Sequence, residues 1–212
     1  MPIIIKICGI NEPSGLQAAV RNGARYVGFV FFPASPRAIT AETAHELIAK
    51  TPNSINKVGL LVNPTDDALK AIAGLRLDLL QLHGNETPRR VAEIGALTGM
   101  PLIKALPVAG SEDFAAVPDY APLVTHFLFD AKAPAGAVMP GGNATAFDWR
   151  ILAGRSFPRP WLLAGGLTPE NVTEAIRISG ATMVDVSSGV EDRPGVKNPD
   201  KIAAFCAAVL GV

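Results

Sequence analysis

Residues 183–191 read MVDVSSGVE, and residues 163–166, earlier in the chain, read LAGG. Each apolar run breaks into small residues, as at a strand end that brings bare backbone N–H groups close to an anion. A (β/α)₈ barrel commonly binds phosphate in the loops that follow its last two strands. The residues expected to bind phosphate are Gly165, Gly166, Ser187, Ser188 and Gly189.

Apolar, strand-like runs recur along the chain and alternate with helix-like segments. Most runs are continuous, which is typical of parallel strands covered on both faces. The predicted strands are Ile3–Cys8, Tyr26–Phe32, Lys57–Val62, Asp78–Leu82, Leu102–Leu106, Phe127–Asp130, Trp161–Ala164 and Met183–Val186. The predicted helices are Pro13–Asn22, Ala41–Lys50, Asp66–Ala73, Pro88–Thr98, Glu112–Ala116, Phe147–Leu152, Pro169–Ser179 and Pro199–Leu210.

This alternation predicts an α/β fold in which all 212 residues form a single-domain (β/α)₈ TIM barrel. A doubly wound open sheet would use the same alternation, but the number of strands and the phosphate loops favour the closed barrel. Three helices are expected to begin at a capping residue followed by proline, at Thr87-Pro88, Thr168-Pro169 and Asn198-Pro199.

Charge and composition exclude several classes of partner. Lys plus Arg equals Asp plus Glu at 19 each, so no net field attracts nucleic acid or an anionic membrane. The apolar N-terminus, Met1 to Ile10, lacks the features of a signal peptide, and no run is long enough to span a membrane. With Cys8 and Cys206 as the only cysteines, these features predict a cytoplasmic protein that binds a small phosphorylated molecule, and no obligate protein partner is inferred.

Two strand ends carry groups suited to proton transfer. Cys8 ends the first predicted strand before Gly9, and Asp130 ends the sixth after an apolar run. A carboxyl in apolar surroundings can act as a general acid, whereas a thiol needs a positive neighbour to act as a base near neutrality. The alternatives are a small buried hydrophobe for Cys8 and a capping or loop-fixing carboxylate for Asp130.

Three further residues are candidates for substrate binding. Arg37 follows two prolines, in a stiff loop that suits bidentate binding of a carboxylate. The same local sequence also fits a solvated loop arginine. His83, before Gly84, either contacts substrate or satisfies backbone groups. Asp185 either binds a sugar hydroxyl or pairs with Lys6 inside the barrel.

Other features carry less chemistry. The three histidines, His45, His83 and His126, lack the spacing of metal ligands, so no metal site is expected. Residues 131–146 read AKAPAGAVMPGGNATA, a long loop that suggests a lid or a plain mobile connection.

Six motifs together resemble phosphoribosylanthranilate isomerase of tryptophan biosynthesis. They are KICGI at 6–10, SPR at 35–37, QLHG at 81–84, FD at 129–130, LAGGL at 163–167 and DVSSGVE at 185–191. The resemblance implies a ribulose-phosphate-binding barrel and a cofactor-free Amadori rearrangement of N-(5-phosphoribosyl)anthranilate to 1-(2-carboxyphenylamino)-1-deoxyribulose 5-phosphate.

Carried over onto matching positions, the resemblance makes Asp130 the general acid that opens the ribose ring and Cys8 the base that removes the C2′ proton. It assigns Arg37 to the anthranilate carboxylate and Asp185 to a ribose hydroxyl. The alternatives are another sugar-phosphate isomerase on the same barrel, which would use paired aspartates, and a catalytically silent barrel that binds a phosphorylated metabolite.

Overall fold

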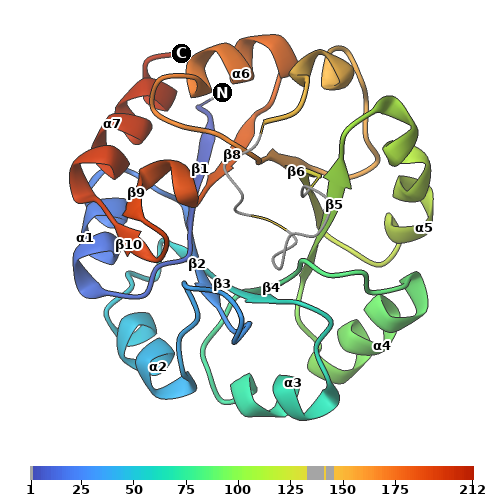
Figure 1. The fold of residues 1–212 in the computed structure, drawn as a ribbon. Coiled ribbons are helices and arrows are strands. Elements are labelled where there is room, and N and C mark those ends of the chain that lie inside the picture. The colour runs from blue at the N-terminus through green and yellow to red at the C-terminus, as the bar shows by residue number, and fades with distance from the viewer. Residues whose placement is uncertain (1, 133–140, 142–145) are drawn as a thin grey trace.

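The computed structural model describes residues 2–132, 141 and 146–212 of the chain. Eight parallel strands, hydrogen-bonded in chain order with β8 returning to β1, close into a barrel, which confirms the predicted fold class (Figure 1). The strands are β1 (Ile4–Cys8), β2 (Tyr26–Val30), β3 (Asn56–Leu61), β4 (Leu79–Leu82), β5 (Leu102–Val108), β6 (His126–Ala131), β7 (Trp161–Leu163) and β8 (Met183–Val186).

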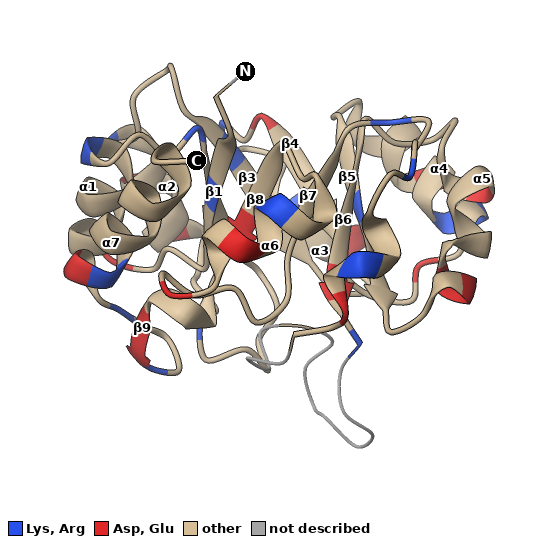
Figure 2. Cartoon of the chain, turned by 90° about the horizontal axis from the view of Figure 1, so that it is seen from above, with Lys and Arg blue, Asp and Glu red and all other residues tan. Residues whose placement is uncertain are grey.

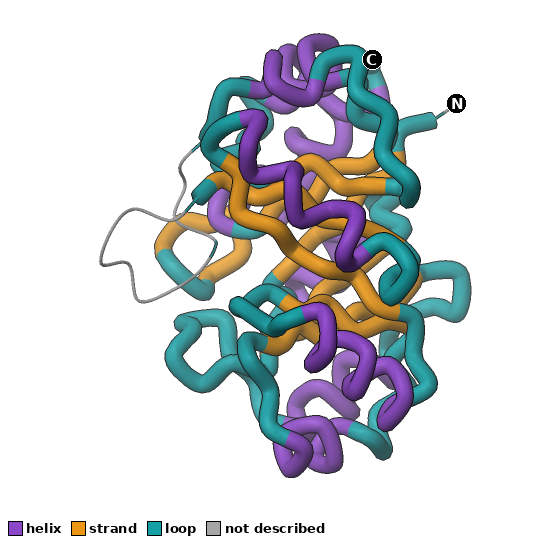
Figure 3. Tube along the Cα trace, turned by 90° about the vertical axis from the view of Figure 1, so that its right-hand side faces the viewer, coloured by secondary structure: helices purple, strands orange, loops and turns teal. Residues whose placement is uncertain are grey.

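The helices surround the ring of strands, as the end-on and side views show (Figures 1 and 3). They are α1 (Pro13–Arg21), α2 (Ala41–Ala49), α3 (Asp66–Ile72), α4 (Pro88–Thr98), α5 (Val117–Tyr120), α6 (Val172–Ser179) and α7 (Pro199–Leu210). Two of the predicted helices are 3₁₀ segments in the structure, η1 (Ser111–Ala116) and η2 (Trp149–Leu152), and η2 begins two residues later than predicted.

Two of the three predicted helix starts are confirmed and one is wrong. Thr87 and Asn198 cap α4 and α7, each with proline at the start of the helix. The prediction fails at Thr168-Pro169, since α6 begins after Asn171. The Asn171 side chain accepts a hydrogen bond from the Thr168 amide at 2.8 Å and donates one to the Gly166 carbonyl at 2.9 Å. These bonds hold the intervening residues in a loop, so the helix starts later.

Thr87→Ala is expected to lower the free energy of unfolding by about 1 kcal/mol, the usual effect of losing a side-chain cap. The Thr87 hydroxyl accepts from the Arg90 amide at 3.2 Å and satisfies one of the unpaired N–H groups of the first turn. Urea unfolding measures the change. Thr87→Ser keeps the acceptor and serves as the control; equal losses in both variants would contradict the capping role.

The barrel interior changes from apolar to polar along its axis. Successive residues of a strand point to opposite faces, so alternate residues share the inner face. One buried cluster includes Val58, Leu79, Ile103, Leu128 and Met183. Further along the same strands and their neighbours lie Cys8, Gln81, Asp130 and Asp185, all lining one pocket. The inner face thus supplies an apolar floor beneath a polar mouth.

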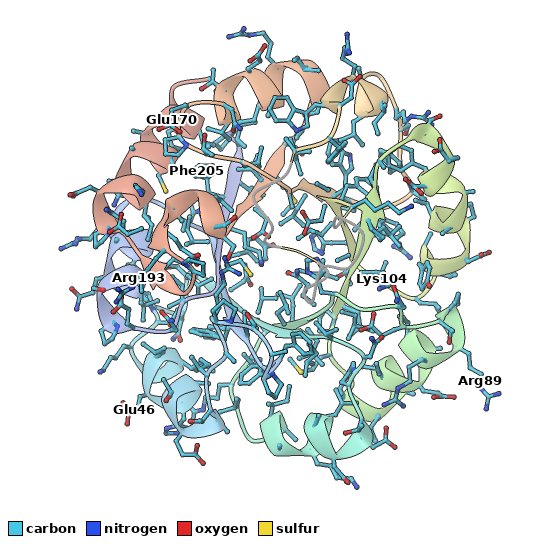
Figure 4. The ribbon with its side chains drawn as sticks, viewed as in Figure 1. Glu46, Arg89, Lys104, Glu170, Arg193 and Phe205 are labelled. Atoms are coloured by element: carbon cyan, nitrogen blue, oxygen red, sulfur yellow. The ribbon has the colours of Figure 1, made fainter. Side chains whose placement is uncertain are left out.

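A buried ion pair fixes the loop that follows β4. The Lys104 ammonium (labelled in Figure 4) lies 2.7 Å from Glu86 Oε2 and donates to the Gly84 carbonyl at 2.7 Å. Glu86 Oε1 accepts from the backbone amides of Asn63 at 2.8 Å and Gly84 at 3.0 Å. The loops after β3 and β4 are therefore held together, and His83 leaves β4 in a fixed direction.

A short hairpin that was not predicted from the sequence precedes the last helix. Strand β9 (Glu191–Arg193) pairs antiparallel with β10 (Val196–Lys197), after the 3₁₀ turn η3 (Ser188–Val190). Positions of basic and acidic residues are both found on each flank of the barrel (Figure 2). Within the described ranges, no helix has the length and apolar character needed to cross a membrane.

Candidate active site

One pocket opens at the C-terminal ends of the strands and gathers most of the predicted site residues. It is lined by Cys8, Arg37, Gln81, His83, Asp130, Gly165, Gly166, Asp185, Ser187 and Ser188, among others. This is the end at which barrels of this kind carry their active sites. Of the predicted residues, only Gly189 is absent from the lining. A Cβ at Gly189 would overlap the Leu167 carbonyl, so this glycine lets the two predicted phosphate loops pack closely.

Cys8 lies at the end of β1 with its thiol buried beside a buried lysine. Burial raises the pKa of Cys8, and the positive charge of Lys6 opposes that rise. Lys6, fully buried, points to the same inner face as Cys8 because the two residues are two positions apart on one strand. Its ammonium lies 2.8 Å from Asp185 Oδ1. The pairing of Asp185 with Lys6 is therefore present, while Asp185 still lines the pocket.

Arg37 is 5% exposed, so the alternative of a solvated loop arginine is wrong. Its Nε and Nη2 groups each donate to Glu191 at 2.8 Å. Lys197 donates to the same carboxylate at 2.7 Å, and also to the Ser187 carbonyl at 2.9 Å. Burial acts to raise the pKa of Glu191, but the bonds from Arg37 and Lys197 lower it. Of this three-residue cluster of two cations and one carboxylate, Arg37 is the member that lines the pocket.

Asp130 and His83 meet across the pocket. His83 Nε2 lies 3.1 Å from Asp130 Oδ2, and His83 Nδ1 lies 2.9 Å from the side-chain amide nitrogen of Gln81. The apolar residues before Asp130 on β6 pack in an aromatic group in which the ring centroids of Phe129 and Phe157 are 4.7 Å apart. Phe129 points to the opposite face of β6 from Asp130, so this aromatic group packs behind the strand while the carboxyl group faces the imidazole in the pocket.

The two predicted phosphate loops lie next to each other at this mouth. Gly165 and Gly166 have φ of +85° and +63°, a left-handed backbone that favours glycine. A Cβ at Gly165 would lie 2.5 Å from the Ala131 backbone nitrogen, so the close approach also needs glycine. Ser187 Oγ donates to the Cys8 carbonyl at 3.1 Å and ties the second loop to β1.

The remaining predictions fall outside the pocket or outside the described residues. His45 lies on α2, and His126 begins β6, where burial lowers its pKa. No cluster of potential metal ligands occurs among the residues that the structure describes. The predicted lid, residues 131–146, lies almost entirely outside the described residues.

A family model described as N-(5'-phosphoribosyl)anthranilate (PRA) isomerase matches residues 5–208. The chain belongs to this family. An N-(5'-phosphoribosyl)anthranilate isomerase of Paracoccus denitrificans is 60% identical over 208 residues, covering 98% of this chain and 97% of that protein. The activity is therefore the isomerisation of phosphoribosylanthranilate in tryptophan biosynthesis.

Solved structures of the family share the fold. The phosphoribosylanthranilate isomerase of Thermotoga maritima has a TM-score of 0.88 at 35% identity, covering 99% of this chain and 100% of that one. Another, in complex with reduced 1-(o-carboxyphenylamino)-1-deoxyribulose 5-phosphate, has a TM-score of 0.83 at 32% identity, with 99% and 100% coverage. These likenesses confirm the family to which the motifs pointed.

Three residues that organise the site are not among the residues predicted from the sequence. Gln81 could have been found, because it lies two positions before His83 on one strand and must share its face. Glu191 was quoted as part of a motif but was given no role, and Lys197 was not considered. Their partners are 154 and 10 residues away in the chain, so neither has a local signal.

Proposed function

We propose that Asp130 and Cys8 divide the two proton transfers of the isomerisation between them. Asp130 donates a proton to the ribose ring oxygen, so the ring opens to an imine. Cys8 then removes the C2′ proton, which yields the enol that becomes the ketose. The observation that supports this division is that both groups open into one pocket, with a buried cation and two glycine-containing loops beside them.

The remaining roles follow from charge and shape. Arg37 binds the anthranilate carboxylate, because the cluster of Arg37, Glu191 and Lys197 carries one more positive than negative charge. The backbone amides of Gly165, Gly166, Ser187, Ser188 and Gly189 bind the phosphate. Asp185 accepts from a ribose hydroxyl with the oxygen that does not face Lys6, and His83 contacts substrate through its place beside Asp130. The steps move protons only, so they require no redox cofactor.

A crystal structure with the reduced product analogue tests these placements. We expect the phosphate within hydrogen-bond distance of the two loops and the aromatic carboxylate within hydrogen-bond distance of Arg37. The alternative orientation, with the phosphate at Arg37 and the carboxylate at the glycine loops, would overturn the assignment of the binding residues while leaving the roles of Cys8 and Asp130 to be tested kinetically.

Arg37→Lys is expected to weaken binding of the product analogue by about 1.5–3 kcal/mol, the usual worth of a hydrogen bond to a charged group. Lysine keeps the charge and a contact to Glu191 but loses the planar guanidinium that binds carboxylates with two parallel bonds. Calorimetric titration measures the affinity. An analogue with a plain phenyl ring is the control, and an equal loss of affinity for both ligands would mean that Arg37 does not bind the carboxylate.

We further propose that the chain functions as one barrel domain in the cytoplasm. The strands of the closed barrel come from both ends of the sequence, so the fold needs nearly its whole length. Both cysteines are free and buried, which fits a reducing compartment. Fractionation of the source cells tests the location.

A further inference from the structure

Gln81 is fully buried on the inner face of β4, and it contacts the proposed acid only through His83. Its amide nitrogen lies 2.9 Å from His83 Nδ1, and His83 Nε2 lies 3.1 Å from Asp130 Oδ2. The three side chains therefore form a chain of two hydrogen bonds that ends at the carboxyl group. Gln81 lies at the start of this chain.

The hydrogen bond from Gln81 to His83 determines which kind of hydrogen bond His83 can make to Asp130. A neutral imidazole has one N–H donor and one acceptor nitrogen, and the partner of one nitrogen determines where the proton lies. The Gln81 side-chain nitrogen can only donate, so with this nitrogen facing Nδ1 at 2.9 Å, Nδ1 is the acceptor and Nε2 of His83 carries the proton. His83 then donates to Asp130 Oδ2, and this oxygen is an acceptor whether or not the carboxyl group is protonated.

The other oxygen of Asp130 is left for the transferable proton. A Cβ built at Gly165 would lie 2.9 Å from Asp130 Oδ1, so Oδ1 faces the proposed phosphate loop. Oδ2 faces the His83 ring instead. A proton on Oδ1 points toward the side of the pocket where the ribose phosphate is proposed to bind, whereas a proton on Oδ2 would be shared with His83.

Nearby charged groups do not compete for His83, since they are already paired. Lys104, on the neighbouring strand β5, is bound to Glu86 at 2.7 Å. Lys6 is bound to Asp185 at 2.8 Å. The other titratable or charged residues lining the same pocket are Cys8, Arg37 and Asp185. Among the described residues, Gln81 is the side chain that contacts His83 Nδ1.

We propose that Gln81 is a positioning residue that holds His83 as the Nε2–H tautomer and thereby keeps the transferable proton of Asp130 on Oδ1. The proposal rests on the proposed role of Asp130 as the acid. During ring opening the Oδ1–H bond breaks and a bond from this proton to the ring oxygen forms. The resulting carboxylate is stabilised by the His83 N–H bond to Oδ2, so His83 neither gains nor loses a proton.

Nitrogen-15 NMR of the histidine rings in the full-length enzyme tests the tautomer directly. At neutral pH we expect His83 Nε2 to be protonated and Nδ1 to be unprotonated. In Gln81→Glu the ionised carboxylate only accepts, so Nδ1 should become protonated. A wild-type ring protonated on Nδ1 would overturn the proposal.

Steady-state kinetics test the consequence. Gln81→Met fills a similar volume without a hydrogen-bonding group. We expect kcat to fall roughly 10-fold or more with KM little changed, because a catalytic-site imidazole in the wrong tautomer no longer supports the proton transfer. Gln17→Met, on an exposed position of α1, is the matched control. An unchanged kcat in Gln81→Met would also overturn the proposal.

The two proposals fail in different ways. If Asp130→Asn kept full activity, the assignment of the acid would be wrong, whatever the tautomer of His83. If Asp130→Asn lost activity but His83 carried its proton on Nδ1, the acid would stand and the role of Gln81 would fall.

Discussion

Cys8→Ser and Asp130→Asn are each expected to lower kcat by about 10²-fold or more, because a positioned acid or base contributes roughly 10²–10⁴-fold. Serine is a far weaker base than a thiolate, and asparagine has no proton to donate to the ring oxygen. Both changes are nearly isosteric, so affinity for the product analogue should be kept. Stopped assays of the isomerisation, with calorimetric titration of the analogue, separate the loss of chemistry from a loss of binding.

The two variants should differ with substrate deuterated at C2′. In Cys8→Ser the removal of that proton becomes slow, so an isotope effect on kcat should appear. In Asp130→Asn ring opening becomes slow, and the isotope effect should be suppressed. The reverse pattern would show that the two roles are exchanged.

Cys206→Ser is the matched control for the thiol. Cys206 is buried in α7, and burial raises its pKa to about 11, so it has no thiolate at neutral pH. Its replacement should leave kcat and the isotope effect unchanged. Loss of activity in Cys206→Ser would mean that a cysteine-to-serine change acts through stability rather than through the base.

Lys6→Met is expected to destabilise the barrel by about 3–5 kcal/mol, because it leaves the buried Asp185 carboxylate without its partner. It should also change the pH dependence of activity. Burial already raises the pKa of Cys8 and Lys6 opposes this, so removing Lys6 raises that pKa further. Activity that depends on the thiolate appears as pH rises through the pKa, so the rising limb should move to higher pH.

Lys57→Met provides the comparison for this prediction. Lys57 is also buried and pairs with Asp78 at 2.8 Å, but the Asp78 side chain is 40% exposed. Water can solvate the remaining carboxylate, so the loss of stability should be smaller and the pH profile should keep its position. Urea unfolding and the pH dependence of kcat measure both effects. A folded Lys6→Met enzyme with an unshifted rising limb would contradict the influence of Lys6 on Cys8.

The sequence predicted the barrel because the signals for its strands and helix starts are local. Continuous apolar runs such as Phe127–Asp130 mark strands covered on both faces, and proline after a capping residue marks the starts of α4 and α7. The failure at Thr168-Pro169 is equally instructive. The sequence correctly predicted a helix here. The hydrogen bonds of the Asn171 side chain with Thr168 and Gly166 hold the preceding residues in a loop, so the helix begins later than predicted.

The sequence by itself determined the strands, their order in the chain and therefore the strand ends at which Cys8, Asp130 and Asp185 lie. Period-two alternation along a strand is a short-range rule, so it also determined which neighbours share a face, as Lys6 does with Cys8. The sequence left the pairing of Asp185 with Lys6, 179 residues away, as one of two alternatives, and the structure shows that pair. Only the tertiary structure decided the other partners: Arg37 with Glu191, 154 residues away, and His83 with Asp130, 47 away. Strand register and closure of the barrel bring these pairs together, and neither is encoded in any one segment of the chain.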